Sequence, residues 1–129
     1  MRERVLPVAL VATFLGAPLA HAAEPAPDLL GTWTGSGRGV GEAEGWTDES
    51  TTLTITEQRG PVFTGTKVYA DGEEAVYGTV RADGRSLLVA DDGDGQAAGT
   101  ILGPDAIEYC YLEGGADAQV HCRVLTRSR

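Results

Sequence analysis

The chain of 129 residues is poor in histidine and cysteine, two side chains that enzymes often use for catalysis. It contains two histidines, two cysteines and one methionine, and it has no Gly-x-Ser-x-Gly motif. A catalytic triad needs a nucleophile beside an oriented base, and transition-metal sites need several His or Cys ligands. Because His21 lies in a predicted leader, His121 is the one histidine expected in the mature chain. The composition therefore predicts no catalytic residues, no metal site and no cofactor.

Positive charge is also scarce. Ten Lys and Arg residues stand against 19 Asp and Glu residues, and the formal net charge is −9. Nucleic acids and anionic membrane surfaces attract basic patches, so neither is an expected partner, whereas a basic protein is compatible with this balance. Because carboxylates are so abundant, no pair of them stands out as the two that a glycosidase would place across a cleft.

The long apolar run that a membrane span requires is missing as well. Arg2 and Arg4 precede an apolar stretch at residues 5–19, and Ala20-His21-Ala22 follows with a small-x-small cleavage pattern. This stretch is shorter than the ~20 apolar residues of a spanning helix and has the form of a secretory leader. A retained interfacial anchor is the alternative. The sequence predicts a periplasmic or secreted protein with a signal peptide at residues 1–22, a flexible lead-in at 23–28 and one domain at 29–129.

Both cysteines lie in the part of the chain that is expected to be exported. An oxidising compartment favours their pairing. If two strands pair on either side of residues 113–117 so that partner numbers sum to 232, Cys110 faces Cys122. Such a bridge closes a loop of about a dozen residues and contributes on the order of 3 kcal/mol. A structural disulfide is expected, with two free thiols or a metal pair as alternatives.

Turn residues recur along the rest of the chain, roughly every dozen residues, as is typical of all-β sandwiches and barrels. Asp71-Gly72 and Asp83-Gly84 are hairpin signals, because glycine accepts the positive φ that tight turns require. A meander of eight strands can close and so remove its edges. The sequence predicts an all-β fold, a single eight-stranded antiparallel up-and-down barrel, with an open sandwich as the alternative. The expected strands are residues 29–35, 51–58, 62–69, 74–81, 86–90, 95–102, 106–112 and 119–126.

The segment at residues 35–45 is rich in glycine and carries Glu42 and Glu44. We expect a long, flexible, acidic loop here, the kind of connection that often carries a binding function. Trp46 follows directly, and three roles remain open for it: covering the barrel mouth, contacting a partner, or simple packing. The other acidic loop, Asp91-Asp92-Gly93-Asp94-Gly95, fails the EF-hand pattern because its sixth position from Asp92 is Ala97. A weak calcium site and an ordinary hairpin loop both remain open there.

Three further side chains on the last strands have expected positions. Tyr109 and Tyr111 alternate with Cys110, so they share a strand face opposite the cysteine. Tyrosines on the outside of a barrel could form a patch for protein contacts, or they could only cover their cross-strand neighbours. His121 lies on the face opposite Cys122 and is expected to be solvated.

The segment Leu30-Gly31-Thr32-Trp33, followed later by Phe63-Thr64-Gly65-Thr66, resembles the opening of avidin-type barrels. The broader lipocalin-like superfamily shares the early Gly-x-Trp. The resemblance implies an eight-stranded up-and-down barrel with Trp33 plugging its closed end. Avidin-type sites use a tyrosine directly after Thr-Gly-Thr, where this chain has Lys67, and later tryptophans, whereas none follows Trp46 here. Biotin binding is therefore not implied.

These observations favour binding over catalysis. The interior of an eight-stranded barrel can be filled by side chains or can hold one small ligand, and the sequence leaves both open. The first hypothesis is a small apolar or amphipathic ligand at the barrel mouth. The alternative is a periplasmic protein-docking barrel of the inhibitor type. The candidate ligand-binding residues are Trp33, Trp46, Lys67 and Tyr69.

Overall fold

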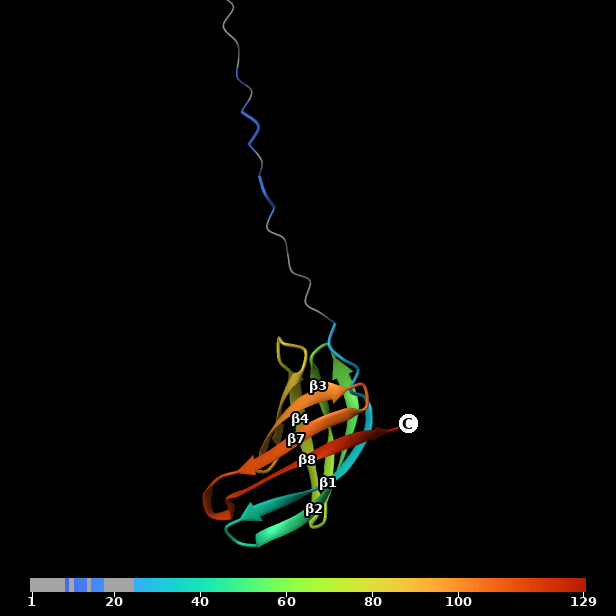
Figure 1. Ribbon diagram of the computed structural model, residues 1–129, viewed down its shortest axis with the longest axis vertical. Helices are drawn as coiled ribbons and strands as arrows, with labels where there is room; N and C mark the ends of the chain where they lie inside the picture. The colour runs from blue at the N-terminus through green and yellow to red at the C-terminus, as the bar shows by residue number, and fades with distance from the viewer. Residues whose placement is uncertain (1–8, 10, 14, 18–24) are drawn as a thin grey trace, which may run out of the picture.

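The computed structural model describes residues 9, 11–13, 15–17 and 25–129 (Figure 1). The predicted cleavage site after Ala22 lies outside the described residues. In the part of the chain that is described, no helix is long and apolar enough to cross a membrane.

Eight antiparallel strands follow one another around a closed barrel (Figure 1). Each strand pairs with the next, and the last returns to pair with the first. This arrangement confirms the predicted meander barrel and excludes the open sandwich. The strands are β1 (Gly31–Gly41), β2 (Gly45–Arg59), β3 (Val62–Tyr69), β4 (Gly72–Val80), β5 (Ser86–Asp91), β6 (Gln96–Gly103), β7 (Ala106–Glu113) and β8 (Gln119–Ser128), with a 3₁₀ turn at Gly115–Asp117.

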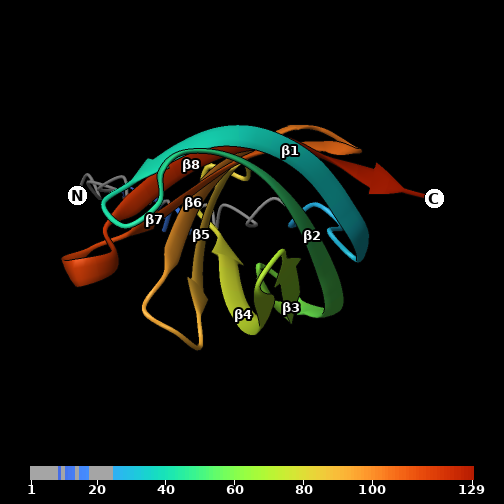
Figure 2. The same cartoon turned by 90° about the horizontal axis from the view of Figure 1, so that it is seen from below.

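The second half of β1 corrects the expectation of a flexible loop at residues 35–45. This half pairs with β2 as far as Gly41↔Gly45, and Figure 2 shows β1 curving around the barrel. A Cβ on Gly37 would lie 2.9 Å from the Cβ of Arg123, and one on Gly39 would lie 2.8 Å from the Cβ of His121. The glycines therefore occupy crowded inward positions beside β8. The loop expectation was wrong because glycine was taken as a sign of flexibility, whereas here it allows a close approach of two strands.

One end of the barrel is closed by a packed apolar core. Trp33 is fully buried, and its Nε1 donates a hydrogen bond to the backbone oxygen of Leu29 at 2.9 Å. The guanidinium of Arg127 covers the tryptophan ring, 4.6 Å from its centroid. Trp33 thus lies at the closed end, as the resemblance implies. The other buried apolar residues packed with it include Leu53, Ile55, Phe63, Val76, Val80, Leu87, Val89, Ile107 and Leu125.

The predicted disulfide joins β7 and β8. Cys110 and Cys122 are bonded, and their Cα atoms lie 4.0 Å apart. The predicted register is confirmed, since Leu112 pairs with Val120 and Cys110 with Cys122. The bridge lies on the outer face of the sheet, because the alternate residues of both strands are buried inside the barrel. It therefore clamps two strands that line the interior without occupying that interior.

Candidate functional site

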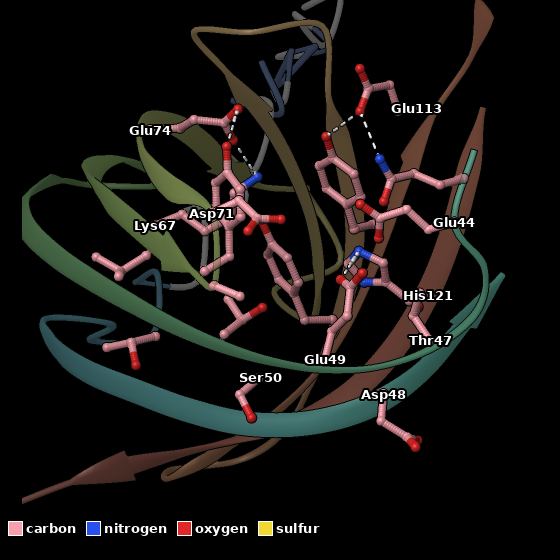
Figure 3. Close-up of a pocket in the computed structure, with 18 residues that line it drawn as sticks. Glu44, Thr47, Asp48, Glu49, Ser50, Lys67, Asp71, Glu74, Glu113 and His121 are labelled. Atoms are coloured by element: carbon pink, nitrogen blue, oxygen red, sulfur yellow. Dashed lines mark hydrogen bonds and ion pairs between the residues drawn. The ribbon is translucent and has the colours of Figure 1, made fainter. Parts of the chain in front are cut away.

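The end of the barrel away from Trp33 encloses a cavity of about 610 Å³ (Figure 3). The same strands form the packed end and the walls of the cavity, because their inward side chains are apolar at one end of the barrel and mostly polar at the other. On β2, for example, Leu53 belongs to the core, whereas Thr51 and Glu49 line the cavity. A smaller hollow of about 250 Å³ at the rim shares Glu49 and other lining residues with it. The side chains discussed below as lining residues are Glu44, Thr47, Glu49, Thr51, Lys67, Tyr69, Asp71, Glu74, Tyr109, Tyr111, Glu113, Gln119 and His121.

Lys67 places a buried cation in one wall of the cavity. The residue is 5% exposed, and its Nζ lies 2.8 Å from Glu74 Oε2 and 2.9 Å from Asp91 Oδ2. The same ammonium lies 4.2 Å from the centroid of the Tyr111 ring, a distance at which cation and ring attract each other. A buried charge is tolerated where it is paired and hydrogen-bonded. The charge of Lys67 is thus satisfied by the protein itself.

Asp91 connects this lysine to the acidic turn after β5. Its Oδ1 accepts hydrogen bonds from the backbone N–H groups of Gly93 at 3.0 Å and Gly95 at 2.9 Å. Burial raises the pKa of Asp91, but hydrogen bonds from Lys67 and Gly95 outweigh this effect and hold the pKa below its ordinary value. Asp91 therefore pairs with Lys67 and also holds the turn after β5 in place through two backbone hydrogen bonds. Among the described residues, no group of three or more His, Cys, Asp or Glu side chains is placed to hold a metal ion.

The opposite wall carries a hydrogen-bonded cluster between β2 and β8. His121 Nε2 lies 3.1 Å from Glu49 Oε2, and His121 Nδ1 contacts the guanidinium of Arg123. Arg123 also donates to Thr51 Oγ1. Because a guanidinium can only donate, Nδ1 is the acceptor and Nε2 carries the proton shared with Glu49. Burial, reinforced by the charge of Arg123, lowers the pKa of His121 to about 4, so the imidazole is neutral at pH 7.

The expected positions of His121 and of two tyrosines are corrected by this arrangement. His121 is 8% exposed, and Tyr109 and Tyr111 are 2% and 7% exposed, so all three lie inside the barrel. The Tyr111 ring stacks on the imidazole of His121, with ring centroids 4.9 Å apart. Burial is the first cause that raises the pKa of both phenols. The alternation with Cys110 was predicted correctly, but the cysteine face is the outer one and the tyrosine face is the inner one.

Two of the four candidate ligand-binding residues line the cavity. These are Lys67 and Tyr69, whose hydroxyl lies 3.4 Å from Glu74 Oε1. Trp33 lies in the packed end, and Trp46 is 87% exposed on the outer face of β2. The cavity is also lined by residues outside the predicted ligand-binding set, namely Glu49, Thr51, Tyr109, Tyr111 and Glu113. On β8 the sequence does indicate the inward face. His121 and Arg123 lie four and two residues before Leu125, so the three side chains share one strand face, and an apolar residue such as Leu125 favours the interior.

Comparisons with known proteins identify the fold and no family. No protein-family model matches the chain, and no curated protein matches it in sequence. Among solved structures, the chain is similar to EF1p2_mFAP2b bound to DFHBI, with 18% identity, a TM-score of 0.55, and coverage of 78% of this chain and 94% of that one. It is also similar to a redesigned β-barrel, b11L5F_LGL, with 13% identity, a TM-score of 0.51, and coverage of 78% and 92%. These likenesses support a small β-barrel and do not single out the avidin type.

Proposed function

We propose that this protein binds a small amphipathic ligand in the cavity at the open end of its barrel. The observation that carries the proposal is a cavity of about 610 Å³ in a barrel whose other end is densely packed. Pockets for small ligands typically enclose about 300–1,000 Å³ and combine apolar surface with a few fixed polar groups. The lining combines phenol and imidazole rings with charged groups. A wholly apolar ligand would leave these polar groups desolvated without a partner.

The hydrogen bonds of His121 and Lys67 support a structural role for these two side chains rather than a role as general base. A general base must have a lone pair free to take a proton from the substrate. His121 uses one ring nitrogen to accept from Arg123 and the other to donate to Glu49. The amino group of Lys67 is engaged by the carboxylates of Glu74 and Asp91. These side chains are therefore suited to hold a fixed shape and charge around a ligand.

Two further observations support the proposal. The similar barrel EF1p2_mFAP2b is described as bound to DFHBI, so a barrel of this shape can hold a small molecule. The disulfide between Cys110 and Cys122 is the kind of bond that persists in oxidising compartments. Together with the leader-like sequence at residues 1–22, it supports a ligand-binding role in the periplasm or outside the cell.

The first experiment is native mass spectrometry of the mature protein purified gently from its own host. A stoichiometric small-mass adduct is expected, and its mass identifies the ligand class. In Thr47→Trp the indole would occupy the cavity, so we expect the adduct to be lost. The matched control is Thr126→Trp, at an exposed position on the outer face of β8, which should retain the adduct. An adduct that persists in both variants would place binding outside the cavity and contradict the proposal.

A second candidate function, docking of a basic protein, is favoured by one observation on the outer surface. Exposed apolar residues form a cross-strand row over β2, β1, β8 and β7, in which Trp46 pairs with Val40, Val40 with Val120, and Val120 with Leu112. Large aromatic side chains often anchor protein interfaces, and the net charge of −9 suits a basic partner. Trp46→Ser should weaken such docking while Thr47→Trp leaves it unchanged, which is the reverse of the outcome for cavity binding.

A further inference from the structure

We infer that the cavity selects organic cations, such as amphipathic amines, over neutral and anionic molecules of the same shape. This inference rests on the proposed ligand-binding function and names its ligand class. Three features of the open end carry it: an excess of negative charge on the lining, a rim without basic side chains, and an unpaired phenol at the inner wall.

Carboxylates outnumber cations around the cavity. Lys67 is the basic side chain of the lining and Arg123 lies behind it beside His121, and both are engaged by carboxylates inside the protein. His121 is neutral, so it adds no positive charge. The carboxylates left without a basic partner in this set are Glu44, Asp71 and Glu113. Glu44 and Asp71 are exposed at the opening and Glu113 is half-buried, so solvent screens part of their field, but all three carry the same sign and attract a cation to the opening.

The hollow at the rim is the place where this excess is most concentrated. Its lining includes Glu44, Glu113 and Asp117, and it contains no Lys or Arg. Glu113 accepts hydrogen bonds from the Tyr111 hydroxyl at 3.0 Å and from Gln119 Nε2 at 3.2 Å. Both donors are neutral, so they orient the carboxylate and leave its charge uncompensated. Figure 3 shows Glu44 and Glu113 on the same side of the cavity as His121.

A second, independent feature points to a ligand deeper inside. Tyr109 is 2% exposed, lines the cavity, and makes no hydrogen bond to any described residue. Tyr69 and Tyr111, by contrast, donate to Glu74 and Glu113. A buried phenol normally finds a partner. A polar group on the inner part of a ligand would supply one, while the ammonium of that ligand remains at the rim.

An organic cation fits these groups better than a metal ion does. A divalent metal requires several oxygen ligands converging within about 2.6 Å of one point, and no group of three or more candidate ligands in the described part of the chain does so. The carboxylates are instead spread around an opening that leads to aromatic walls. An amine on an apolar body matches that distribution, because its charge is at one end and its apolar surface at the other.

The test compares probes of matched shape and different charge against the purified mature protein. One set is tryptamine, tryptophol and indole-3-propionic acid, and the other is octylamine, octanol and octanoic acid, each measured by isothermal titration calorimetry at pH 7. We expect each amine to bind about tenfold or more tightly than its alcohol, which corresponds to about 1.4 kcal/mol. The acids should bind most weakly. Added salt should weaken amine binding and leave alcohol binding nearly unchanged.

Two double variants remove the same number of charges at different places. Glu44→Gln with Glu113→Gln should reduce amine affinity several-fold and leave alcohol affinity unchanged. Glu42→Gln with Glu108→Gln changes exposed carboxylates that do not line the cavity, and it should leave the amine preference intact. The glutamate-to-glutamine changes are conservative, and circular dichroism confirms that each variant is folded.

The outcomes separate this inference from the proposed function. If alcohols or acids bind as tightly as amines, and Thr47→Trp abolishes that binding, the cavity binds ligands but the cation preference is wrong. If none of the six probes binds, the cation preference is likewise overturned, and the proposed function then depends on the native adduct alone. An equal loss of amine affinity in both double variants would show an effect of net charge and would also overturn the inference.

Discussion

The two ends of this barrel are built from the same strands, yet one is packed and the other is hollow. At the closed end, inward positions carry large apolar side chains around Trp33, and Arg127 covers the base. At the open end, inward positions carry Lys67, His121 and Arg123, each held by hydrogen bonds or ion pairs. The contrast shows that period-two alternation separates the two faces of a strand but says nothing of whether the interior is filled. The character of each inward residue decides that.

Among the substitutions that test this contrast, we expect the largest loss of stability at the closed end. Trp33→Ala removes a fully buried indole and its hydrogen bond to Leu29. We expect the free energy of unfolding to fall by about 3–5 kcal/mol, the usual cost of truncating a buried aromatic residue. Tyr109→Phe, which removes only a hydroxyl that faces the cavity, should change it by less than about 1 kcal/mol. Urea unfolding followed by circular dichroism compares the two, and equal losses would contradict the distinction between packed and hollow ends.

An intermediate effect is expected at the seam between β1 and β8. A Cβ at Gly37 would lie 2.9 Å from the Cβ of Arg123, so Gly37→Ala forces the strands apart. We expect a loss of about 1–3 kcal/mol in the free energy of unfolding, as is typical of overpacking. The control is Gly114→Ala, because a Cβ there meets nothing within 4 Å and the φ angle of Gly114 is −102°. Thermal melts of both variants distinguish them, and an unchanged Gly37→Ala protein would mean that the seam is not crowded.

A further effect concerns pH and again separates the two ends. Burial and the charge of Arg123 lower the pKa of His121 to about 4, whereas an unfolded histidine titrates near 6.5. The unfolded chain therefore binds the extra proton first, and stability is lost as the pH falls from about 6.5 towards 4. We expect a loss of about 2 kcal/mol between pH 6.5 and 4.5.

Urea titrations at several pH values would measure this dependence. His121→Gln should flatten the dependence in that window, and Trp33→Phe, at the closed end, should keep it. Asp91, whose pKa lies below its ordinary value, contributes only at lower pH. A slope that survives in His121→Gln would assign the pH dependence to other groups.

Much of the fold could be predicted from the sequence because its signals are local. Asp-Gly pairs mark turns, and pairing the two strands symmetrically about residues 113–117 is enough to place Cys110 opposite Cys122. The second half of β1 could not be recognised from composition, since glycine is frequent in loops and also where two strands approach closely. Its inward role depends on β8, which lies about eighty residues later in the chain.

The site was predicted less well, and β7 shows why. Ile107, Tyr109 and Tyr111 share one face, while Cys110 and Leu112 share the other, and both faces contain apolar residues. Alternation therefore defines two faces without saying which one is inside. Lys67 and Tyr69 lie at every second position after Phe63 and so share its strand face, and the structure puts all three inside the barrel. The ion pairs that keep Lys67 inside come from β4 and β5 and are not visible in its own strand.

The glycines of β1 also affect how this protein could acquire new specificity. Along the seam, Gly35, Gly37, Gly39 and Gly41 contribute no side chains, so the polar groups of that wall come from β8 and, across the glycines, from Glu49 and Thr51 of β2. A change at position 121 or 123 therefore meets only backbone on β1, but it removes a partner from Glu49 or Thr51 on β2. The glycine strand thus acts as a narrow spacer that lets side chains of β2 and β8, two strands that are not neighbours, bond to each other across it.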